Sequence, residues 1–403
     1  MTSVVRRPAR AKVALVLALS AGSTGIAACG APSTEGQQTI STTSALSVGT
    51  IQALADAMNN SPTASITLTG NINAAGFAWR VPYFAGTLDG GNKIISNLTT
   101  SDVTASDFLV GHSGMVGRMD YATIKNLSLT NLRVTGSWAA GGLAGDCALC
   151  TIENVAVEGT VNAPAYVGGI VGGMSLGSVT RSYFKGTVTG GDQGAGGLVG
   201  LAYGDDENYA TITQSYAQAV NQTSTLVAGI TASGIHPAGG IVGTGSSVSV
   251  TDVYAIGSVS GRGSAGGLFG LPACDNSKGW ILNRGIYRGN VTDTSLGGSA
   301  AWAGTVGQAT DASNCGVRAS LLYFNSDLDT NTNYFAIDQR RSKGSELTAP
   351  TAPTKANGGI FCPPSQTLVP CGDDPFATPP WDFGTSSQNN VLMYMPGPNT
   401  QIR

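Results

Sequence analysis

The carboxylates are the residues of this chain whose clustering could do chemistry. Asp205, Asp206 and Glu207 follow one another between two regular segments. Two carboxyl groups at a suitable separation can act as the acid and the base of a glycosidase. A solvated acidic turn explains the same run more simply, because charged loop residues normally face water. We therefore treat the three residues as candidate ligand contacts and assign no catalytic residue.

The histidines and the oxygen-rich stretch from Asp327 to Asn333 give little evidence for a catalytic or metal site. The chain has 2 histidines, His112 and His236, and neither belongs to the HExxH pattern of zinc peptidases. His112 is interpreted as a turn residue, whereas His236 lies in the longest insertion and is kept as a candidate ligand contact. The run from Asp327 to Asn333 alternates oxygen ligands like a calcium loop, but Thr332 occupies the position that needs glycine. No metal site and no cofactor are predicted.

A Ser–His–Asp triad is not ruled out by residue counts, but no Gly-x-Ser-x-Gly turn between a strand and a helix supports one. Four tryptophans fall near the edges of a repeated pattern, where an exposed indole could stack on sugar rings or anchor a protein. They are Trp79, Trp138, Trp280 and Trp302. Trp280 ends an inserted segment and is a candidate ligand contact. The alternative for each indole is that it fills a gap between loops.

The cysteines indicate an oxidising compartment. Of the 7 cysteines, Cys29 is set apart by its place after an export signal, and six remain. Proximity favours the pairs Cys147–Cys150, Cys274–Cys315 and Cys362–Cys371. Because six cysteines allow 15 connectivities, that pairing stays open. A redox or zinc role for the CxxC of Cys147 and Cys150 is weakly supported, since no second CxxC or histidine pair accompanies it.

A repeated unit must position these residues. Glycine blocks such as Gly141-Gly142-Leu143-Ala144-Gly145 and Gly168-Gly169-Ile170-Val171-Gly172 occur six times between Gly114 and Gly270. Each block is followed by a nine-residue segment of alternating apolar residues, and the segments begin at Thr123, Thr151, Ser178, Thr211, Ser249 and Ile281. Extra residues enter at only two places per unit, as loops do on a repeated scaffold.

A unit of 27 or 28 residues is too short to bury a core and must stack on its neighbours. Glycine, threonine and β-branched residues disfavour helix, so the unit is predicted to contain short strands that turn at glycines. Stacked strands would rise by about 4.8 Å per unit. The fold class predicted from the repeat is all-β, a β-solenoid in which inward apolar side chains form columns.

The glycine blocks resemble the GLUG-type repeats of bacterial surface proteins, which also occur in non-catalytic parts of immunoglobulin-A-specific metallopeptidases. The stretch from Phe84 to Leu98 is similar to the first coil that precedes such repeats. The resemblance covers roughly Leu46 to Gly307. It implies a right-handed parallel β-helix displayed at a cell surface, and it implies no activity, because the family is defined by its repeat.

The two ends of the chain differ from the repeat. Residues 1–28 have a basic start, an apolar run and an ending that resembles a lipobox before Cys29. Processing there would leave the mature protein lipid-anchored through Cys29, and an ordinary signal peptide is the alternative. Residues 29–48 are predicted to be a flexible tether. A short helix with Thr50 as its N-cap is expected to cover the open end of a solenoid spanning 49–333. Residues 334–403, rich in proline, are predicted to form an irregular C-terminal cap.

Charge excludes one class of partner. Removal of the first 28 residues takes four basic groups and leaves 17 basic and 24 acidic ones, so nucleic acid is not an expected partner. The favoured function is a non-catalytic, lipid-anchored binding or adhesion module at the bacterial surface, with an extracellular protein or glycan as ligand. Inserted loops would form its contact surface. The alternatives are a carbohydrate-active enzyme and a passive envelope spacer.

Overall fold

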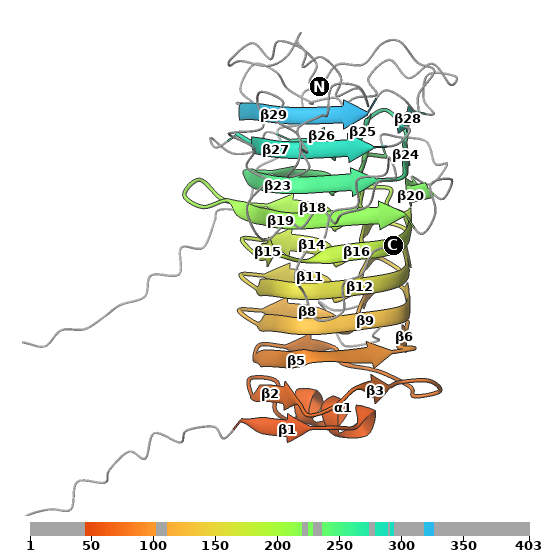
Figure 1. The fold of residues 1–403 in the computed structure, drawn as a ribbon, viewed down its shortest axis with the longest axis vertical. Coiled ribbons are helices and arrows are strands. Elements are labelled where there is room, and N and C mark those ends of the chain that lie inside the picture. The colour runs from red at the N-terminus through yellow and green to blue at the C-terminus, as the bar shows by residue number, and fades with distance from the viewer. Residues whose placement is uncertain are drawn as a thin grey trace, which may run out of the picture. The chain divides into compact units, whose positions relative to one another are not determined.

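The computed structural model describes residues 45–101, 111–219, 225–228, 236–273, 279–288, 291–293 and 318–325. These residues form three sheets of parallel strands and one helix, as Figure 1 shows. The all-β prediction with one short helix is therefore confirmed. The predicted signal peptide, Cys29, the predicted tether up to residue 44, the stretch from Asp327 to Asn333 and the predicted C-terminal cap lie outside the described residues, as do Cys274, Cys315, Cys362, Cys371 and Trp302.

Sheet A has 16 strands and carries the alternating segments. Its strands are β1 (Leu46–Val48), β2 (Ser65–Leu68), β3 (Ile72–Asn73), β5 (Thr87–Ser96), β6 (Thr99–Thr100), β9 (Thr123–Thr135), β12 (Thr151–Ala163), β15 (Ser178–Thr180), β16 (Tyr183–Gly190), β19 (Ala210–Ala219), β20 (Thr225–Ala228), β23 (Val248–Ile256), β24 (Ser258–Gly261), β27 (Ile281–Arg288), β28 (Val291–Asp293) and β29 (Arg318–Asn325).

The glycine blocks contribute the other two sheets. Sheet C consists of β7 (His112–Ser113), β10 (Ala139–Gly141), β13 (Tyr166–Gly168), β17 (Gly194–Gly196), β21 (Ala238–Gly239) and β25 (Ala265–Gly266). Sheet B consists of β4 (Tyr83–Phe84), β8 (Val116–Asp120), β11 (Ala144–Ala148), β14 (Val171–Ser175), β18 (Val199–Tyr203), β22 (Val242–Ser246) and β26 (Phe269–Pro272). We call one passage of the chain through sheets A, C and B a coil.

The coils keep their register along sheet A. The first residues of the predicted segments are direct partners of one another in the order Thr123, Thr151, Ser178, Thr211, Ser249 and Ile281, and Arg318 of β29 follows. The sequence-based alignment of the repeat is therefore confirmed residue by residue. The strand expected near Ala319 is also present, as β29.

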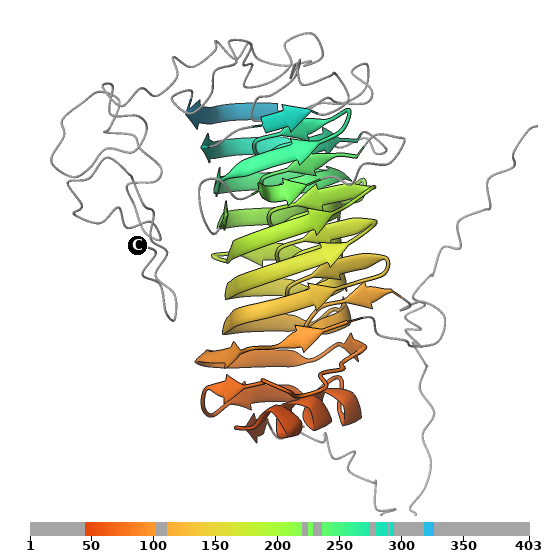
Figure 2. The same ribbon diagram turned by 90° about the vertical axis from the view of Figure 1, so that its right-hand side faces the viewer.

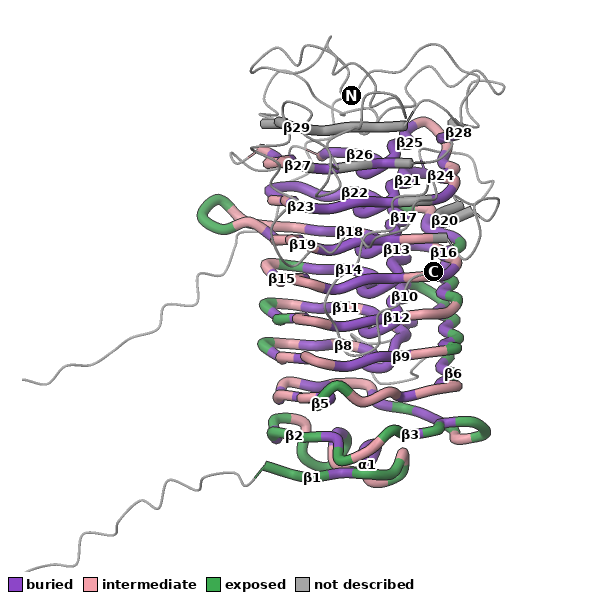
Figure 3. Tube along the Cα trace, in the orientation of Figure 1, coloured by how far each residue is buried: buried purple, intermediate pink, exposed green. Residues whose placement is uncertain are grey.

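Columns of apolar side chains fill the coils. Residues in register such as Ile124, Ile152 and Val179 are each 0% exposed. The turn between sheets C and B contributes Leu143, Ile170 and further inward residues, so buried positions run through every coil in Figure 3. Full burial of each such side chain stabilises the fold by roughly 1.5–3 kcal/mol. The core is thus a continuous stack, as the repeat predicts.

Gly142 shows why the blocks are rich in glycine. A Cβ atom added there would lie 2.5 Å from the carbonyl oxygen of Gly169 and 2.6 Å from Cγ1 of Val157. The first contact is with the next coil and the second is with sheet A. Both are shorter than real Cβ contacts, so no side chain fits between the sheets at this point.

The predicted helix is α1 (Ile51–Asn60). The side chain of Thr50 accepts a hydrogen bond from the N–H of Ala53 at 3.2 Å, which is the expected N-cap. Leu54, Ala55 and Met58 are buried. The helix packs against β4, the last strand of sheet B, and Figure 2 shows it at the N-terminal end of the stack. It therefore covers a sheet edge, as predicted.

Three sequence-based boundaries need correction. Leu46–Val48, predicted as the end of the tether, form β1 and pair with β2. Strands β9 and β12 have 13 residues and not nine. The strands bend at Asn126 and Asn154, where φ is 53°, and β9 bends again at Asn131, where φ is 52°, without ending there. The first three residues after Gly200 belong to β18, so the insertion there spans only 204–209.

Candidate ligand-binding surface

Five aromatic and charged side chains lie on or beside neighbouring strands of sheets C and B. We call His112, Arg118, Trp138, Asp146 and Tyr166 the aromatic–ionic patch. Register brings them together, because Ala139 beside Trp138 pairs with His112 on one side and Tyr166 on the other. Asp146 pairs directly with Arg118. Sheet B thus places Arg118 and Asp146, which are 28 positions apart in the sequence, on adjoining strands.

The aromatic half of the patch holds an exposed indole in a fixed place. Trp138 is 45% exposed, and its ring meets that of Tyr166 edge to face, with centroids 6.2 Å apart and planes at 82°. The backbone N–H of Trp138 donates to Gly111 O at 3.0 Å, and its carbonyl accepts from Ala165 N at 2.9 Å. Gly111 must lack a side chain, because its φ is 84° and an added Cβ would lie 2.7 Å from that of Trp138.

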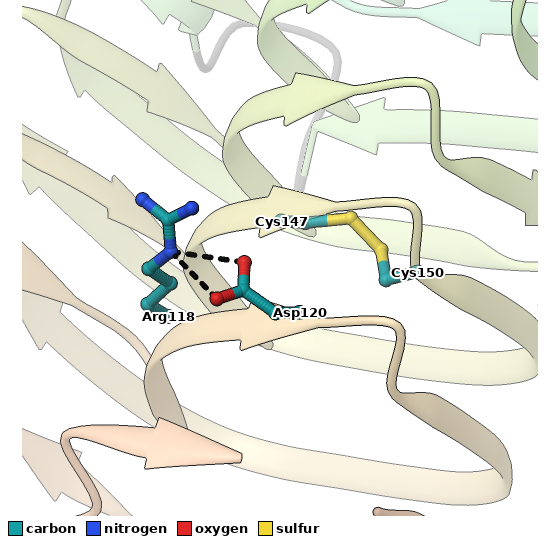
Figure 4. Close-up of a disulfide and its surroundings, with 4 residues drawn as sticks. All are labelled: Arg118, Asp120, Cys147 and Cys150. Atoms are coloured by element: carbon teal, nitrogen blue, oxygen red, sulfur yellow. Dashed lines mark hydrogen bonds and ion pairs between the residues drawn. A yellow bond between two sulfur atoms is a disulfide. The ribbon is translucent and has the colours of Figure 1, made fainter. Parts of the chain in front are cut away.

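The ionic half is a guanidinium shared by two carboxylates. Arg118 Nε donates to Asp120 Oδ1 at 2.9 Å and to Oδ2 at 3.2 Å, a contact drawn in Figure 4. Arg118 Nη1 lies 3.1 Å from Asp146 Oδ2. The side chains of Arg118, Asp120 and Asp146 are 33%, 23% and 27% exposed. The network is thus half-buried yet open to a ligand.

Burial changes the acidity of this network. It raises the pKa of Asp146 above the ordinary value of a carboxyl group, and the nearby charges of Arg118 and His112 oppose the rise. The Asp120 carboxylate adds to the rise. Burial thus disfavours the charged form of Asp146.

His112 joins the two halves. A Cβ added to Gly145 would lie 2.9 Å from Cβ of His112, so sheets B and C touch at this point. Nδ1 of His112 is buried without a hydrogen-bond partner. His112 pairs in register with Ala139, next to Trp138, and acts electrostatically on Asp146, so this residue lies between the two halves along the chain of contacts.

The disulfide predicted between Cys147 and Cys150 is present, and Figure 4 shows it beside Arg118 and Asp120. Its Cα atoms are 5.8 Å apart, and both cysteines are buried. The bond spans the turn that follows Asp146 in β11. It therefore fixes the backbone immediately after the patch. The other predicted pairs fall on cysteines outside the described residues.

The acidic run of Asp205, Asp206 and Glu207 forms a turn. The side chain of Asp205 accepts a hydrogen bond from the N–H of Glu207 at 2.8 Å, and its own N–H donates to Asn208 O at 2.8 Å. One carboxylate of the three thus serves to close the loop between β18 and β19. This arrangement is that of the solvated acidic turn, the simpler of the two explanations of this run.

The other two candidate contacts are buried. His236 is 4% exposed, and its Nδ1 lies 3.1 Å from the carbonyl oxygen and 3.5 Å from Oδ1 of Asp192. Trp280 is 0% exposed, its ring packs edge to face on Phe269 at 5.4 Å, and its Nε1 donates to Ala273 O. As an exposed stacking residue Trp280 was the wrong choice, because the indole fills a gap between strands. These candidates do not share one surface, since His236 lies between sheets A and C.

Sequence reasoning singled out Trp138 but missed Arg118, Asp146 and Tyr166, and it interpreted His112 as a turn residue, whereas His112 begins β7. Arg118 and Asp146 each follow the closing glycine of a block, Gly117 and Gly145. The same position is apolar or small in other copies, as at Gly173 and Leu201. Comparing the copies at that one position would have shown that two successive coils carry opposite charges there.

Comparisons with known proteins give partial similarities. No family model matches the chain. Halomucin of Haloquadratum walsbyi is 34% identical in an alignment of 145 residues, which covers 29% of this chain and 2% of halomucin. An IgA1 protease structure covers 77% of the chain at 20% identity and a TM-score of 0.48, and the chain covers 25% of it. An immunoglobulin A1 protease candidate from Bacteroides ovatus has 16% identity and a TM-score of 0.44 over 76% of this chain and 81% of its own.

Proposed function

We propose that this protein is a non-catalytic binding or adhesion module, built as a right-handed parallel β-helix and held at the bacterial surface by lipid on Cys29. The observation that carries the proposal is the exposed indole of Trp138, whose backbone is hydrogen-bonded to the coils on both sides. An aromatic side chain that is already ordered loses little entropy when a ligand covers it. The contact surface is assigned to the aromatic–ionic patch.

The state of the carboxylates supports binding over hydrolysis. A glycosidase needs one carboxyl group free to donate a proton and a second free to attack or to activate water. Asp120 and Asp146 share the guanidinium of Arg118, and Asp205 closes its own loop. All three are thus engaged as hydrogen-bond acceptors. Such groups suit recognition of a ligand's donors.

Two features support the extracytoplasmic location. The disulfide of Cys147 and Cys150 belongs to a class of bond that forms and persists in oxidising compartments. The basic leader and apolar run before Cys29 have the order of an export signal. Among the described residues, no helix is both long and apolar enough to span a bilayer. Lipid on Cys29 is the anchor that we propose.

The function is tested by adherence. Bacteria that display the full-length protein are applied to surfaces coated either with polysaccharides or with extracellular matrix glycoproteins. We expect adherence above that of cells without the protein, and a loss of it with Trp138→Ala. Adherence equal to the control cells on every coating would contradict the proposal.

Two controls accompany this assay. Cys29→Ala should move the protein from the membrane fraction to the medium, and unchanged fractionation would exclude the lipid anchor. Asp205→Asn with Asp206→Asn should leave adherence intact. Release of reducing ends from a coating polysaccharide, abolished by the same pair of substitutions, would favour the enzyme instead.

A further inference from the structure

We infer that the aromatic–ionic patch is a binding site for a neutral carbohydrate, with a sugar ring on the indole of Trp138 and hydroxyl groups of the same oligosaccharide on Asp146 and Arg118. The inference rests on the proposed function and names its ligand class. Three independent features of the patch carry it: the aromatic contact, the open polar atoms beside it, and the charge.

The aromatic contact fits a single ring. The described residues expose four large hydrophobic side chains, namely Leu46, Tyr121, Trp138 and Leu149. The other three lie in β1 or at the corners between sheets B and A, so Trp138 is the one on the sheet C side. A protein partner would need a total buried area of about 1,000 Å² with apolar anchors. One isolated indole with a polar neighbourhood suits the apolar face of a sugar, because the ring face is negative and sugar C–H groups are weakly positive.

The polar atoms have room for a ligand. Gly173 is the register partner of Asp146 one coil later, and a Cβ added there would lie 3.1 Å from Asp146 Oδ1. The glycine thus leaves the space beside that oxygen free of side chain. Leu201 occupies the equivalent position in the following coil, so the scaffold does not require glycine here. Arg118 has five N–H donors, which exceed the contacts that the two carboxylates receive from it.

The charge decides between neutral and anionic sugars. With both carboxyl groups ionised, Asp120, Asp146 and Arg118 together carry one net negative charge. A sulfated or uronic-acid polymer would be repelled by this excess, whereas hydroxyl groups can donate to the carboxylates and accept from Arg118. The site therefore selects for uncharged polyhydroxy ligands.

The test uses affinity electrophoresis of the full-length mature protein through gels containing dextran, mannan or galactan, with dextran sulfate as the matched anionic polymer. We expect at least one neutral polymer to retard the protein and to shift its tryptophan emission. Trp138→Ala, which installs the residue type found one coil later at Ala165, should weaken that retardation at least tenfold. Gly173→Leu, which copies Leu201, should weaken it by blocking Asp146 Oδ1.

Tyr121→Ala is the control, because this side chain is 74% exposed at the corner between sheets B and A and should leave retardation unchanged. Circular dichroism melting confirms that each variant folds. The inference is overturned if no neutral polymer retards the protein, if dextran sulfate retards it more than dextran, or if Trp138→Ala migrates like the parent. Should displaying cells still adhere to glycoprotein coatings through another surface, the binding function survives and only the carbohydrate site is lost.

Discussion

The side-chain amide of Asn154 donates a hydrogen bond to Oδ1 of Asn126, 2.9 Å away and one coil earlier. Asn126 in turn donates to Asp89 Oδ1 at 3.1 Å. Burial alone would raise the pKa of Asp89, but hydrogen bonds from Gly91 and Asn126 and the charge of Lys125 lower it overall. A polar column thus ties three coils together on the outside of sheet A.

Substitutions of Asn126 should separate the contribution of its side-chain hydrogen bonds from that of its backbone conformation. Asn126→Ala loses two hydrogen bonds, each worth about 1 kcal/mol. It also places an ordinary residue at φ of 53°, which costs roughly 1–2 kcal/mol more. Asn126→Gly loses only the hydrogen bonds. Urea unfolding should therefore show a larger loss of unfolding free energy for Ala than for Gly, and equal losses would mean that the backbone conformation carries no cost.

Replacement of Leu149 should stabilise the protein. It adopts φ of 54° with a side chain that is 42% exposed, in a conformation that asparagine tolerates better than leucine. We expect Leu149→Asn to raise the free energy of unfolding by about 1 kcal/mol. Thermal and urea denaturation measure the change. Leu54→Asn, at a buried helix position, is the contrasting control and should destabilise strongly. No gain at Leu149 would mean that its side chain makes a compensating contact.

The disulfide should contribute modestly to stability. Closing a loop of about four residues between Cys147 and Cys150 restricts the unfolded chain by about 2 kcal/mol in the entropic model. Replacing both cysteines by serine should lower the unfolding free energy by that order. Reduction of the parent protein with dithiothreitol should reproduce the loss. If the serine variant is as stable as the oxidised parent, and reduction does not change the stability of the parent, the disulfide makes no such contribution.

Gly142 and Gly70 form a matched pair. Gly142→Ala places a methyl group against the next coil and Val157, as described above, and should destabilise by at least 2 kcal/mol. Gly70→Ala meets no atom within 4 Å and should be neutral or slightly stabilising, because alanine has less freedom in the unfolded chain. Denaturation midpoints compare the two. Equal tolerance at both sites would disprove the close approach of the sheets.

Three buried tyrosines should make the protein sensitive to alkali. Tyr183, Tyr216 and Tyr254 stack with centroids 4.7 and 4.6 Å apart, and burial raises the pKa of each phenol. Because the folded state holds the proton more tightly, this contribution is present below about pH 10 and is lost as pH rises above it. Phenolate absorbance should therefore rise together with unfolding. Tyr216→Phe should move unfolding to higher pH, whereas Tyr121→Phe should not, and absorbance that rises without unfolding would contradict the prediction.

The repeat and its register were predictable because both depend on local patterns. Glycine spacing located the strands of sheets B and C, and the alternation beginning at Thr151 and Ser178 aligned sheet A correctly. The helix followed from Thr50 and the spacing of Leu54 and Met58. The lengths of β9 and β12 were not predictable because asparagine at positive φ allows a strand to bend and continue, which alternation does not reveal.

The aromatic–ionic patch was not predictable in the same way. Its contacts join Arg118 to Asp146 and Trp138 to Tyr166, and each pair is adjacent only after two coils have stacked. Single residues could be proposed from sequence, but their exposure could not. Trp138 and Trp280 looked equivalent at the repeat edges, and packing against Phe269 is what buries the second.

The stacking of coils also determines how the protein would respond to a pulling force. Each coil in the regular part bonds to the one before and the one after, so tension applied across the ends would detach coils singly, beginning where the stack is weakest. A detached coil of 27 or 28 residues would lengthen the chain by about 90 Å. Such a molecule would unfold in steps under force and refold coil by coil when the force fell, so it would absorb a load before it unfolded completely.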